Sequence, residues 1–413
     1  MNQFKSYISE NALLPFIGLL IPIWLPGALL ISLIHLLGLI IYRQIQNPLR
    51  RPSVWLTGVA ASYLLIQVTG LLNTEDFNNG IFNLQQKLSL LFFPVLLTSG
   101  QKINWHVTRK TLLNFCVGSI AISVFLLLKA TWHWLNEKDI QVFYYQQLAS
   151  HLHPSYLAAY LCFSIGIIGP ETFTTAMPVT RLKRIIGLIE ILFCLGVIYL
   201  LQSKAGIIVA FCIILFLFAS WFYKEIWHRS LGLRIIVVAT FVGLCLFAIS
   251  RIQNERFKAM FDTLQNGHLE QDPHESTQLR LAVWQSGVAV FEQNWLCGTG
   301  AGDVKHDLND EYTQRGMHYA ADLMLNAHNQ FLQTAIGGGI FQLLLLIAFI
   351  LLPARLTPHR YRLPALLLVF IIVVNMLFES YFESQWGLVF ACFFIALFSG
   401  THAPLDTPRE ISI

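Results

Sequence analysis

Long apolar stretches separated by short polar segments follow one another along almost the whole chain. A helix needs roughly 20 apolar residues to cross a bilayer core about 30 Å thick. The pattern therefore predicts an all-α polytopic membrane protein with about twelve transmembrane helices. The predicted spans are residues 12–24, 27–42, 54–73, 83–99, 111–130, 156–170, 185–201, 206–223, 234–251, 331–353, 363–380 and 385–400.

The first two predicted spans form one apolar run from Leu13 to Tyr42. Within it, Pro22, Pro26 and Gly27 indicate either a tight hairpin between two helices or a kink within one. Whether residues 12–42 cross the membrane once or twice stays open at this point.

One polar segment is far longer than the others and separates the ninth span from the tenth. This divides the chain into nine helices in residues 1–251, a loop with helices in 252–330, and three helices with a tail in 331–413. A single large loop on one face of a membrane protein is where function usually concentrates.

The basic residues alternate between the two sides of the predicted bundle. Of the 27 Lys and Arg residues, seventeen lie in seven short segments at every second gap, and six lie in or beside the long loop. An excess of positive charge in short loops marks the cytoplasmic side. Both termini are therefore predicted inside, with residues 252–328 on the outer side. The seventeen are Lys5, Arg43, Arg50, Arg51, Lys102, Arg109, Lys110, Arg181, Lys183, Arg184, Lys224, Arg229, Arg234, Arg355, Arg360, Arg362 and Arg409.

Composition agrees with this topology, because 55% hydrophobic and 12% charged residues are incompatible with a soluble domain of 413 residues. The net charge of +4 is explained by the topology, so no nucleic-acid partner is predicted. The N-terminus lacks the pattern of a cleavable signal. Six of the seven Cys lie in predicted spans and only Cys297 lies in a polar segment, so no disulfide framework is expected.

The long loop contains a helix with a strong start signal. Asp272–Glu275 combines an Asp N-cap, Pro at the first helical position and Glu three residues after the cap. Gln278, Gln285 and Glu292 recur every seven residues and define its wet face. Arg280 lies about 200° from Gln278 and therefore off that face. It either reaches from an interfacial helix towards lipid headgroups or is a buried guanidinium that awaits an anionic ligand.

The segment Gly298-x-Gly300-x-Gly302 follows that helix. A dinucleotide-binding fingerprint would instead follow a strand and open a helix. The glycines more plausibly let the backbone approach a neighbouring helix or a phosphate closely.

Three other outer positions carry candidate chemistry. His328 lies at the predicted membrane boundary and is either an interfacial hydrogen-bonding residue or a catalytic base. Lys204 lies in a very tight turn between two spans, where it either snorkels or holds an anion. His153 and Tyr156 end the second outer loop.

No metal site is predicted on this side. No Cys or carboxylate lies at ligand spacing from the His151-x-His153 pair. The acidic group Asp307, Asp310 and Glu311 could hold Mg²⁺ near a pyrophosphate, but a solvated helix face is the favoured interpretation.

Together these residues resemble the O-antigen ligases, which form a larger group with the O-antigen polymerases. The resembled motif is a His-Asn pair, nine residues and then a glycine, which matches His328, Asn329 and Gly339. The family's loop arginine corresponds to Arg280. Two positions depart from the family pattern: Gln342 stands three residues after Gly339, where the family has Gly, Thr or Tyr, and Lys204 stands where an arginine is usual. Glu379 belongs to a further segment similar to the family.

The resemblance implies a metal-independent glycosyltransferase of the bacterial inner membrane with its active site on the periplasmic side. The donor would be a glycan on undecaprenyl pyrophosphate and the acceptor a sugar hydroxyl of lipid A–core, both embedded among membrane lipids, with no cofactor. His328 would act as the base, while Arg280 and Lys204 would bind the pyrophosphate. Asn329, His153, Tyr156 and Glu379 are additional candidate site residues.

Several alternatives remain. A polymerase of the same superfamily usually has two sizeable outer loops with basic motifs, whereas this chain has one, which favours the ligase. No sequence motif selects the acceptor, so another lipid-linked glycan ligase is also possible. A flippase would carry charged residues deep within its spans and an internal repeat, but only Glu190 lies well inside a span and no repeat is visible.

Overall fold

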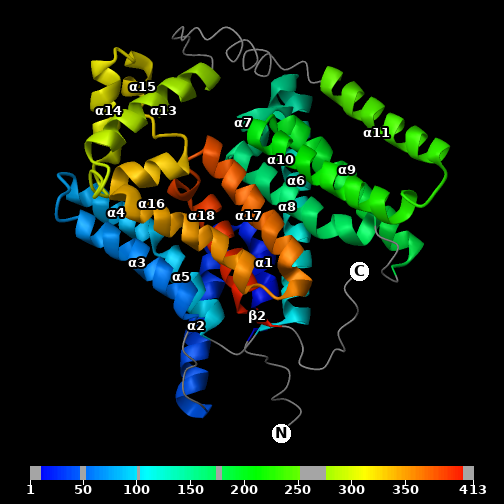
Figure 1. Cartoon of the computed structure of the whole chain (residues 1–413), viewed down its shortest axis with the longest axis horizontal. Helices are drawn as coiled ribbons and strands as arrows, with labels where there is room; N and C mark the ends of the chain where they lie inside the picture. The colour runs from blue at the N-terminus through cyan, green and yellow to red at the C-terminus, as the bar shows by residue number, and fades with distance from the viewer. Residues whose placement is uncertain (1–10, 47–52, 100–102, 174–178, 252–275, 403–413) are drawn as a thin grey trace.

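The computed structural model describes residues 11–46, 53–99, 103–173, 179–251 and 276–402, and it is almost entirely helical (Figure 1). The described strands are β1 (Ile103–Asn104) and β2 (Thr401–His402), which form one short parallel pair. Two short helical turns matter below, η2 (Ile140–Phe143) and η4 (Tyr381–Glu383). The α-helices are α1 Leu14–Ile23, α2 Leu25–Gln46, α3 Val54–Gly70, α4 Phe77–Lys87, α5 Ser89–Thr98, α6 Trp105–Glu137, α7 Tyr145–Ala149, α8 Pro154–Phe173, α9 Arg181–Leu201, α10 Lys204–Trp221, α11 Leu231–Arg251, α13 Ser276–Gln293, α14 Val304–Gln314, α15 His318–Asp322, α16 Gln330–Leu356, α17 His359–Phe378 and α18 Gln385–Gly400.

The apolar helices match the predicted spans. Among the described residues, seven helical segments are long and apolar enough to cross a membrane: Phe77–Thr98, α6, α8, α9, Lys204–Ile226, α16 and α17. Five shorter apolar helices fall on the other predicted spans: Leu14–Ile23, Leu25–Ile40, Val54–Gly70, Leu231–Gly243 and Gln385–Gly400. The all-α polytopic class is confirmed, while the number of crossings stays a prediction.

The first apolar run is broken at one residue. Trp24 leaves the helical conformation, with φ −150° and ψ 86°, and separates α1 from α2. Pro26 lies in the first turn of α2, where a proline ring is tolerated because that N–H needs no partner within the helix. The residues that predicted a hairpin or a kink thus surround a break between two helices.

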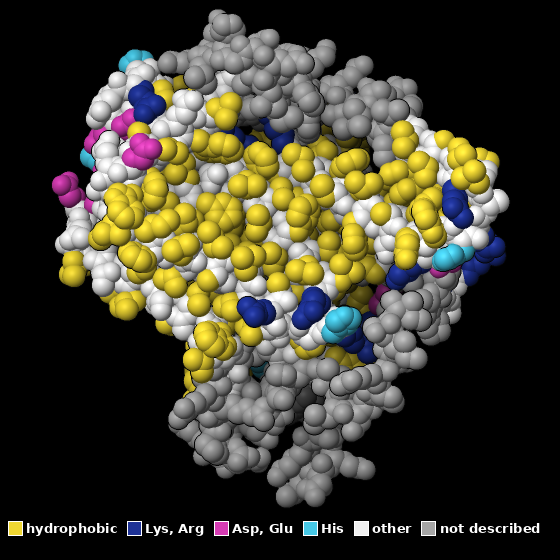
Figure 2. All heavy atoms as spheres, viewed as in Figure 1, with side chains coloured by type: hydrophobic (Ala, Val, Ile, Leu, Met, Phe, Trp, Pro, Cys, Tyr) yellow, Lys and Arg dark blue, Asp and Glu magenta, His cyan; other side chains and the backbone are white. Residues whose placement is uncertain are grey.

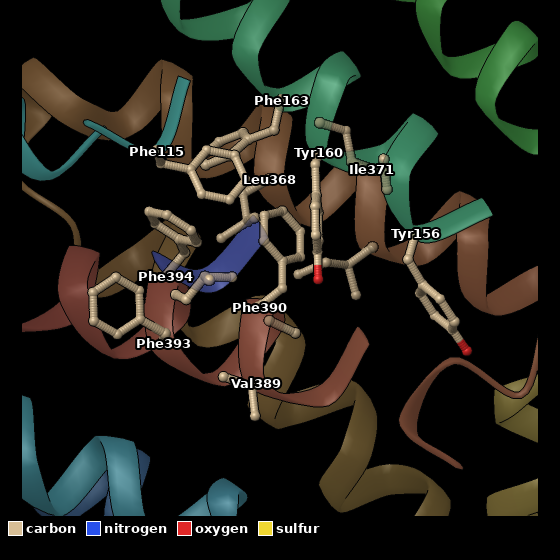
Figure 3. Packing of buried hydrophobic residues seen from close by; sticks show 14 of the residues in the cluster. Phe115, Tyr156, Tyr160, Phe163, Leu368, Ile371, Val389, Phe390, Phe393 and Phe394 are labelled. Carbon is tan, nitrogen blue, oxygen red and sulfur yellow. The ribbon is translucent and has the colours of Figure 1, made fainter. Parts of the chain in front are cut away.

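The centre of the bundle is an aromatic cluster (Figure 3). The ring of Phe115 on α6 lies 5.6 Å from that of Tyr160 on α8 and 4.9 Å from that of Phe394 on α18. Tyr160 and Phe390 are 4.9 Å apart. Edge-to-face and tilted pairs at these distances stabilise a core beyond the burial of their area. The cluster fixes α8 and α18 against each other, and the outer end of α8 contributes to the site described below.

Basic segments that the charge pattern assigns to one side come together at one end of the bundle. The guanidinium of Arg360 lies 4.2 Å from the centre of the Trp105 ring, and Tyr361 donates to the Trp105 carbonyl at 2.8 Å. Arg109 pairs with Glu171, near the inner end of α8, at 2.9 Å. Figure 2 shows dark-blue side chains below a broad hydrophobic face; at the left edge near α14, acidic side chains lie beside another dark-blue one. A gathering of basic segments at one end of the bundle is the pattern that the positive-inside rule predicts.

The topology can be tested with cysteine labelling from the periplasmic side. In a Cys297→Ser background, which removes an exposed native thiol, we expect Asp310→Cys on α14 to react with a membrane-impermeant maleimide. Lys183→Cys, at an equally exposed position of α9, should react only after permeabilisation. Labelling of the Lys183→Cys protein in intact spheroplasts would overturn the predicted orientation.

The long loop folds into helices that pack on one another. Val283 of α13, Leu308 and Tyr312 of α14 and Ala320 of α15 form a separate small core. The helix start predicted at Asp272–Pro273 lies outside the described residues. Gln285 and Glu292 of the predicted wet face are exposed, whereas Gln278 is half-buried.

The glycine-rich segment of this loop packs against a break in α16. Gly338 and Gly339 leave the helical conformation, and Gly339 has φ +67°, a value that favours glycine. The N–H of Thr299 donates to Ile336 at 2.8 Å, and that of Ile340 donates to Trp295 at 2.9 Å. Of the two interpretations of the Gly298–Gly302 segment, the structure supports close approach to a neighbouring helix.

Candidate active site

Arg280 leaves the wet face of α13 and makes an ion pair with Glu379. Its Nη2 lies 2.9 Å from Glu379 Oε1, and the two side chains are 21% and 13% exposed. Glu379 directly follows α17 and has an extended backbone, with φ −142° and ψ 149°. Arg280 lies on a different face of α13 from Gln285, as the helical periodicity predicted, and on that face it reaches Glu379 at the end of α17.

His328 lies near the second oxygen of the same carboxylate. Its Nδ1 lies 3.6 Å from Glu379 Oε2, and its side chain is 26% exposed. The backbone of His328 has φ +45°, and its N–H donates to Asn326 Oδ1 at 3.0 Å. A non-glycine residue in this region needs local support. The side chain of Asn326 supplies that support, because it also accepts from the Ser380 hydroxyl at 3.1 Å.

Glu379 is thus the shared partner of two residues predicted from the sequence. Its Oε1 also accepts a hydrogen bond from the Ser155 hydroxyl at 3.3 Å. Burial by itself raises the pKa of this carboxyl. The neighbouring His328 and the positive charge of Arg280 outweigh burial and hold the pKa at about 2. The carboxyl group of Glu379 is therefore ionised near neutral pH.

Lys204 lines a pocket together with Arg280 and Glu379. The turn before it is tight because Gln202 adopts φ +50° and Ser203 caps α10, its hydroxyl accepting from the Gly206 N–H at 3.2 Å. The empty space within this open pocket is about 340 Å³, adjoining solvent included. It is lined by Tyr145, Ser155, Gln202, Ser203, Lys204, Ala205, Arg280, Phe378 and Glu379.

The pocket combines features that suit an anionic ligand. Lys204 is the first residue of α10, so the positive end of a helix dipole adds to its ammonium. The guanidinium of Arg280 reaches the same space from α13. Ser203 and Ser155 add hydroxyls at the rim. The arrangement can bind a phosphate group and, through His328 beside it, accept a proton.

Other candidates from the sequence lie next to the pocket without lining it. His153 Nδ1 accepts from the Ser155 N–H at 3.4 Å. The ring of Tyr156 lies 5.1 Å from Tyr381 and 5.8 Å from His153. Asn329 caps α16, its Oδ1 accepting from the Leu332 N–H at 3.1 Å. These contacts are structural, and a role for the three residues in substrate binding stays a prediction.

Several pocket residues were not identified from the sequence. Ser155 belongs to the His153–Tyr156 segment, but nothing in the pattern distinguishes its hydroxyl. Tyr145 adopts φ +48° at the start of α7, and Phe378 ends α17. A serine beside a proline at a helix start and an aromatic residue at a span end are too common to signal a site.

Of the acidic residues of α14, Asp310 is exposed, whereas Asp307 and Glu311 are half-buried. Glu311 pairs with Arg315 at 2.6 Å, and Asp310 lies 3.4 Å from His306, both one helical turn away. Across the described ranges, no group of three or more His, Cys, Asp or Glu side chains has the geometry to hold a metal ion. The favoured interpretation, a solvated helix face, therefore holds for Asp310 but not for Asp307 and Glu311.

Part of the chain that contains this site is similar to a known family. The family model described as O-antigen ligase matches residues 190–347, a segment that includes Lys204, Arg280 and His328 but ends before Glu379. No curated protein matches the chain. The resemblance seen in the sequence is confirmed over residues 190–347, the part of the chain that the family model matches.

Proposed function

We propose that the protein transfers a glycan from undecaprenyl pyrophosphate to a sugar hydroxyl of lipid A–core at the periplasmic face of the inner membrane. The observation that carries the proposal is that Arg280 and His328 both approach the half-buried carboxylate of Glu379, while Lys204 lines the same pocket. Each of the three lies within the matched family domain. Two cations suit a pyrophosphate, and an imidazole suits the proton of an attacking hydroxyl.

The transfer is a displacement at the anomeric carbon. The acceptor oxygen forms a bond to that carbon while the bond from the carbon to the pyrophosphate oxygen breaks. The hydroxyl proton moves to His328, and the electron pair of the broken bond stays on undecaprenyl pyrophosphate. With Nδ1 turned to Glu379, the Nε2 of a neutral imidazole is the acceptor for that proton.

The leaving group is stabilised by charge. Negative charge grows on the bridging oxygen as the glycosidic bond breaks, and Arg280 and Lys204 lie where they can neutralise it. A guanidinium offers two parallel hydrogen bonds to phosphate, while an ammonium acts as a point charge. No separate acid is required, because a pyrophosphate is already a good leaving group.

Lipid-linked substrates fit the location of the pocket. Its lining comes from the starts of α8 and α10 and the end of α17, so it lies at one end of three long apolar helices. A carrier lipid can keep its chain in the bilayer there while its pyrophosphate enters the pocket. The lower dielectric at a membrane boundary strengthens the electrostatic interactions.

A polymerase that joins repeat units on the carrier lipid is the second candidate, because it would use the same pocket. The chain has one sizeable outer loop, and this favours the ligase. Deletion of the gene followed by lipopolysaccharide electrophoresis separates the two. Loss of the O-antigen ladder with accumulation of carrier-linked polymer supports the ligase. Accumulation of single repeat units supports the polymerase, and an unchanged ladder and carrier pool would refute both.

Lys204 offers a milder test of the pocket. Lys204→Arg should keep most of the transfer activity, because the resembled family usually carries arginine in this turn and the charge is preserved. Lys204→Ala should weaken donor binding by about tenfold, the effect of losing one charge-assisted hydrogen bond. Both variants should be compared in a donor-binding titration with purified protein. Equal affinity of the alanine variant and the unmodified protein would remove Lys204 from the pyrophosphate site.

A further inference from the structure

Glu379 contacts both the residue proposed to bind the donor, Arg280, and the residue proposed to act as the base, His328. Its Oε1 holds Arg280 at 2.9 Å, a distance typical of a strong charge-assisted hydrogen bond. Its Oε2 lies 3.6 Å from His328 Nδ1, which is longer than a hydrogen bond. The carboxylate therefore engages the pyrophosphate-binding cation firmly and the base only loosely.

We propose that Glu379 is a positioning residue that couples donor binding to the base. The donor pyrophosphate binds Arg280 in place of the Glu379 carboxylate, and the released carboxylate then moves into hydrogen-bonding distance of His328. This inference rests on the proposed function. The approach to His328 requires a movement of less than about 1 Å, within the reach of a side-chain adjustment. It fixes the imidazole with its Nδ1–H on Glu379 and stabilises the imidazolium that forms during transfer.

The surroundings of Glu379 favour such an exchange. Arg280 faces it from α13, His328 from the segment before α16, and His153 from the start of α8. Lys204 lines the same pocket from α10. Among these described groups Glu379 is the one carboxylate, so an incoming pyrophosphate competes directly with it for the cations. The Ser155 hydroxyl, at 3.3 Å, can keep holding Oε1 after Arg280 turns to the phosphate.

The imidazole of His328 lacks a hydrogen-bond partner that the Glu379 carboxylate could supply. The Nδ1 of His328 is buried and makes no hydrogen bond in the described part of the chain. A buried ring nitrogen without a partner is costly. When the carboxylate moves to His328, Nδ1 gains a hydrogen-bond partner and that cost is removed. The imidazole is therefore oriented as a base only when a donor is bound.

A purely structural role predicts the opposite effect on donor binding. If Glu379 only anchors α13 to the end of α17, removing its charge loosens Arg280 and weakens binding of the pyrophosphate. If Glu379 competes with the donor for Arg280, removing its charge strengthens that binding. The direction of the change in donor affinity therefore separates the two explanations.

The test uses purified full-length protein in nanodiscs with an undecaprenyl pyrophosphate-linked glycan as the probe. Glu379→Gln should bind this donor about threefold to tenfold more tightly, the range expected for losing one partly exposed competing ion pair. Turnover should fall by about 100-fold or more, because the base is no longer oriented. The acid limb of its pH–turnover profile should move to lower pH, since the neighbouring negative charge is gone.

Two further variants make the test specific. Glu379→Asp keeps the charge but shortens the reach, so it should change affinity and turnover in the same directions by smaller factors. Glu383→Gln is the matched control, because Glu383 lies four residues further along the same segment and pairs with Lys87 at 2.9 Å. It should not strengthen donor binding. Thermal denaturation should establish that each variant is folded.

The outcomes are distinct. Weaker or unchanged donor binding in both Glu379 variants would overturn the competition with the pyrophosphate. Unchanged turnover in Glu379→Gln would overturn the orienting role. Failure of the proposed function looks different: either the unmodified protein transfers no glycan, or His328→Ala transfers it at the normal rate, whatever the Glu379 variants do.

Discussion

Replacing His328 with alanine is expected to lower glycan transfer by about 10²–10⁴-fold, the usual contribution of a general base. Donor binding should stay within about threefold of normal, because a base acts on the acceptor proton in the transition state and not on the bound pyrophosphate. The measurement is turnover of a purified ligation reaction, with donor affinity determined in parallel by titration.

His306→Ala is the control for this experiment. His306 is an exposed imidazole on α14 of the same loop, where it lies 3.4 Å from Asp310. Its removal should leave transfer unchanged. If His328→Ala retains near-normal transfer, His328 is an interfacial packing residue and the base must be found elsewhere in the pocket.

Replacing Arg280 with alanine is expected to reduce both donor affinity and turnover, each by about 10–100-fold. The guanidinium meets the pyrophosphate before the reaction and also as charge grows on the leaving oxygen, so both quantities depend on it. Arg280→Lys should restore only part of the loss, because the planar fork is missing. Transfer by the unmodified protein should survive a chelator, since these side chains supply the positive charge.

Arg315→Ala is the control for Arg280, because Arg315 is an exposed loop arginine that pairs with Glu311 on its own helix. Its loss should change neither affinity nor turnover measurably, as expected for a surface ion pair. A loss of turnover in Arg280→Ala with unchanged donor affinity would show that the guanidinium does not contact the bound pyrophosphate.

Much of the fold was predictable because a bilayer imposes a strong pattern on sequence. Apolar stretches of span length located the main helices, and helical periodicity alone placed Arg280 off the face that carries Gln285 and Glu292. The tight turn before Lys204 was equally predictable, since only a few residues separate two spans there. These features depend on neighbours within a few turns of one helix.

The role of Glu379 could not be predicted in this way. Its partners Ser155, Arg280 and His328 come from three distant parts of the chain, and no local spacing links them. The same holds for the glycine segment, where sequence alone left a helix and a phosphate as alternatives. Only the backbone hydrogen bonds from Thr299 to Ile336 and from Ile340 to Trp295 decide between them. Long-range contacts of this kind leave no periodic signal.

The break at Gly338–Gly339 divides α16 into an outer piece that follows His328 and a longer inner piece within the bundle. The loop is tied to α16 on both sides of the break, by the hydrogen bonds from Thr299 to Ile336 and from Ile340 to Trp295. Helices adapt to thicker or thinner bilayers by changing their tilt. Because Trp295 and Thr299 belong to one short segment, these bonds brace the two pieces of α16 against each other, so a change in tilt should carry the loop and the imidazole along together.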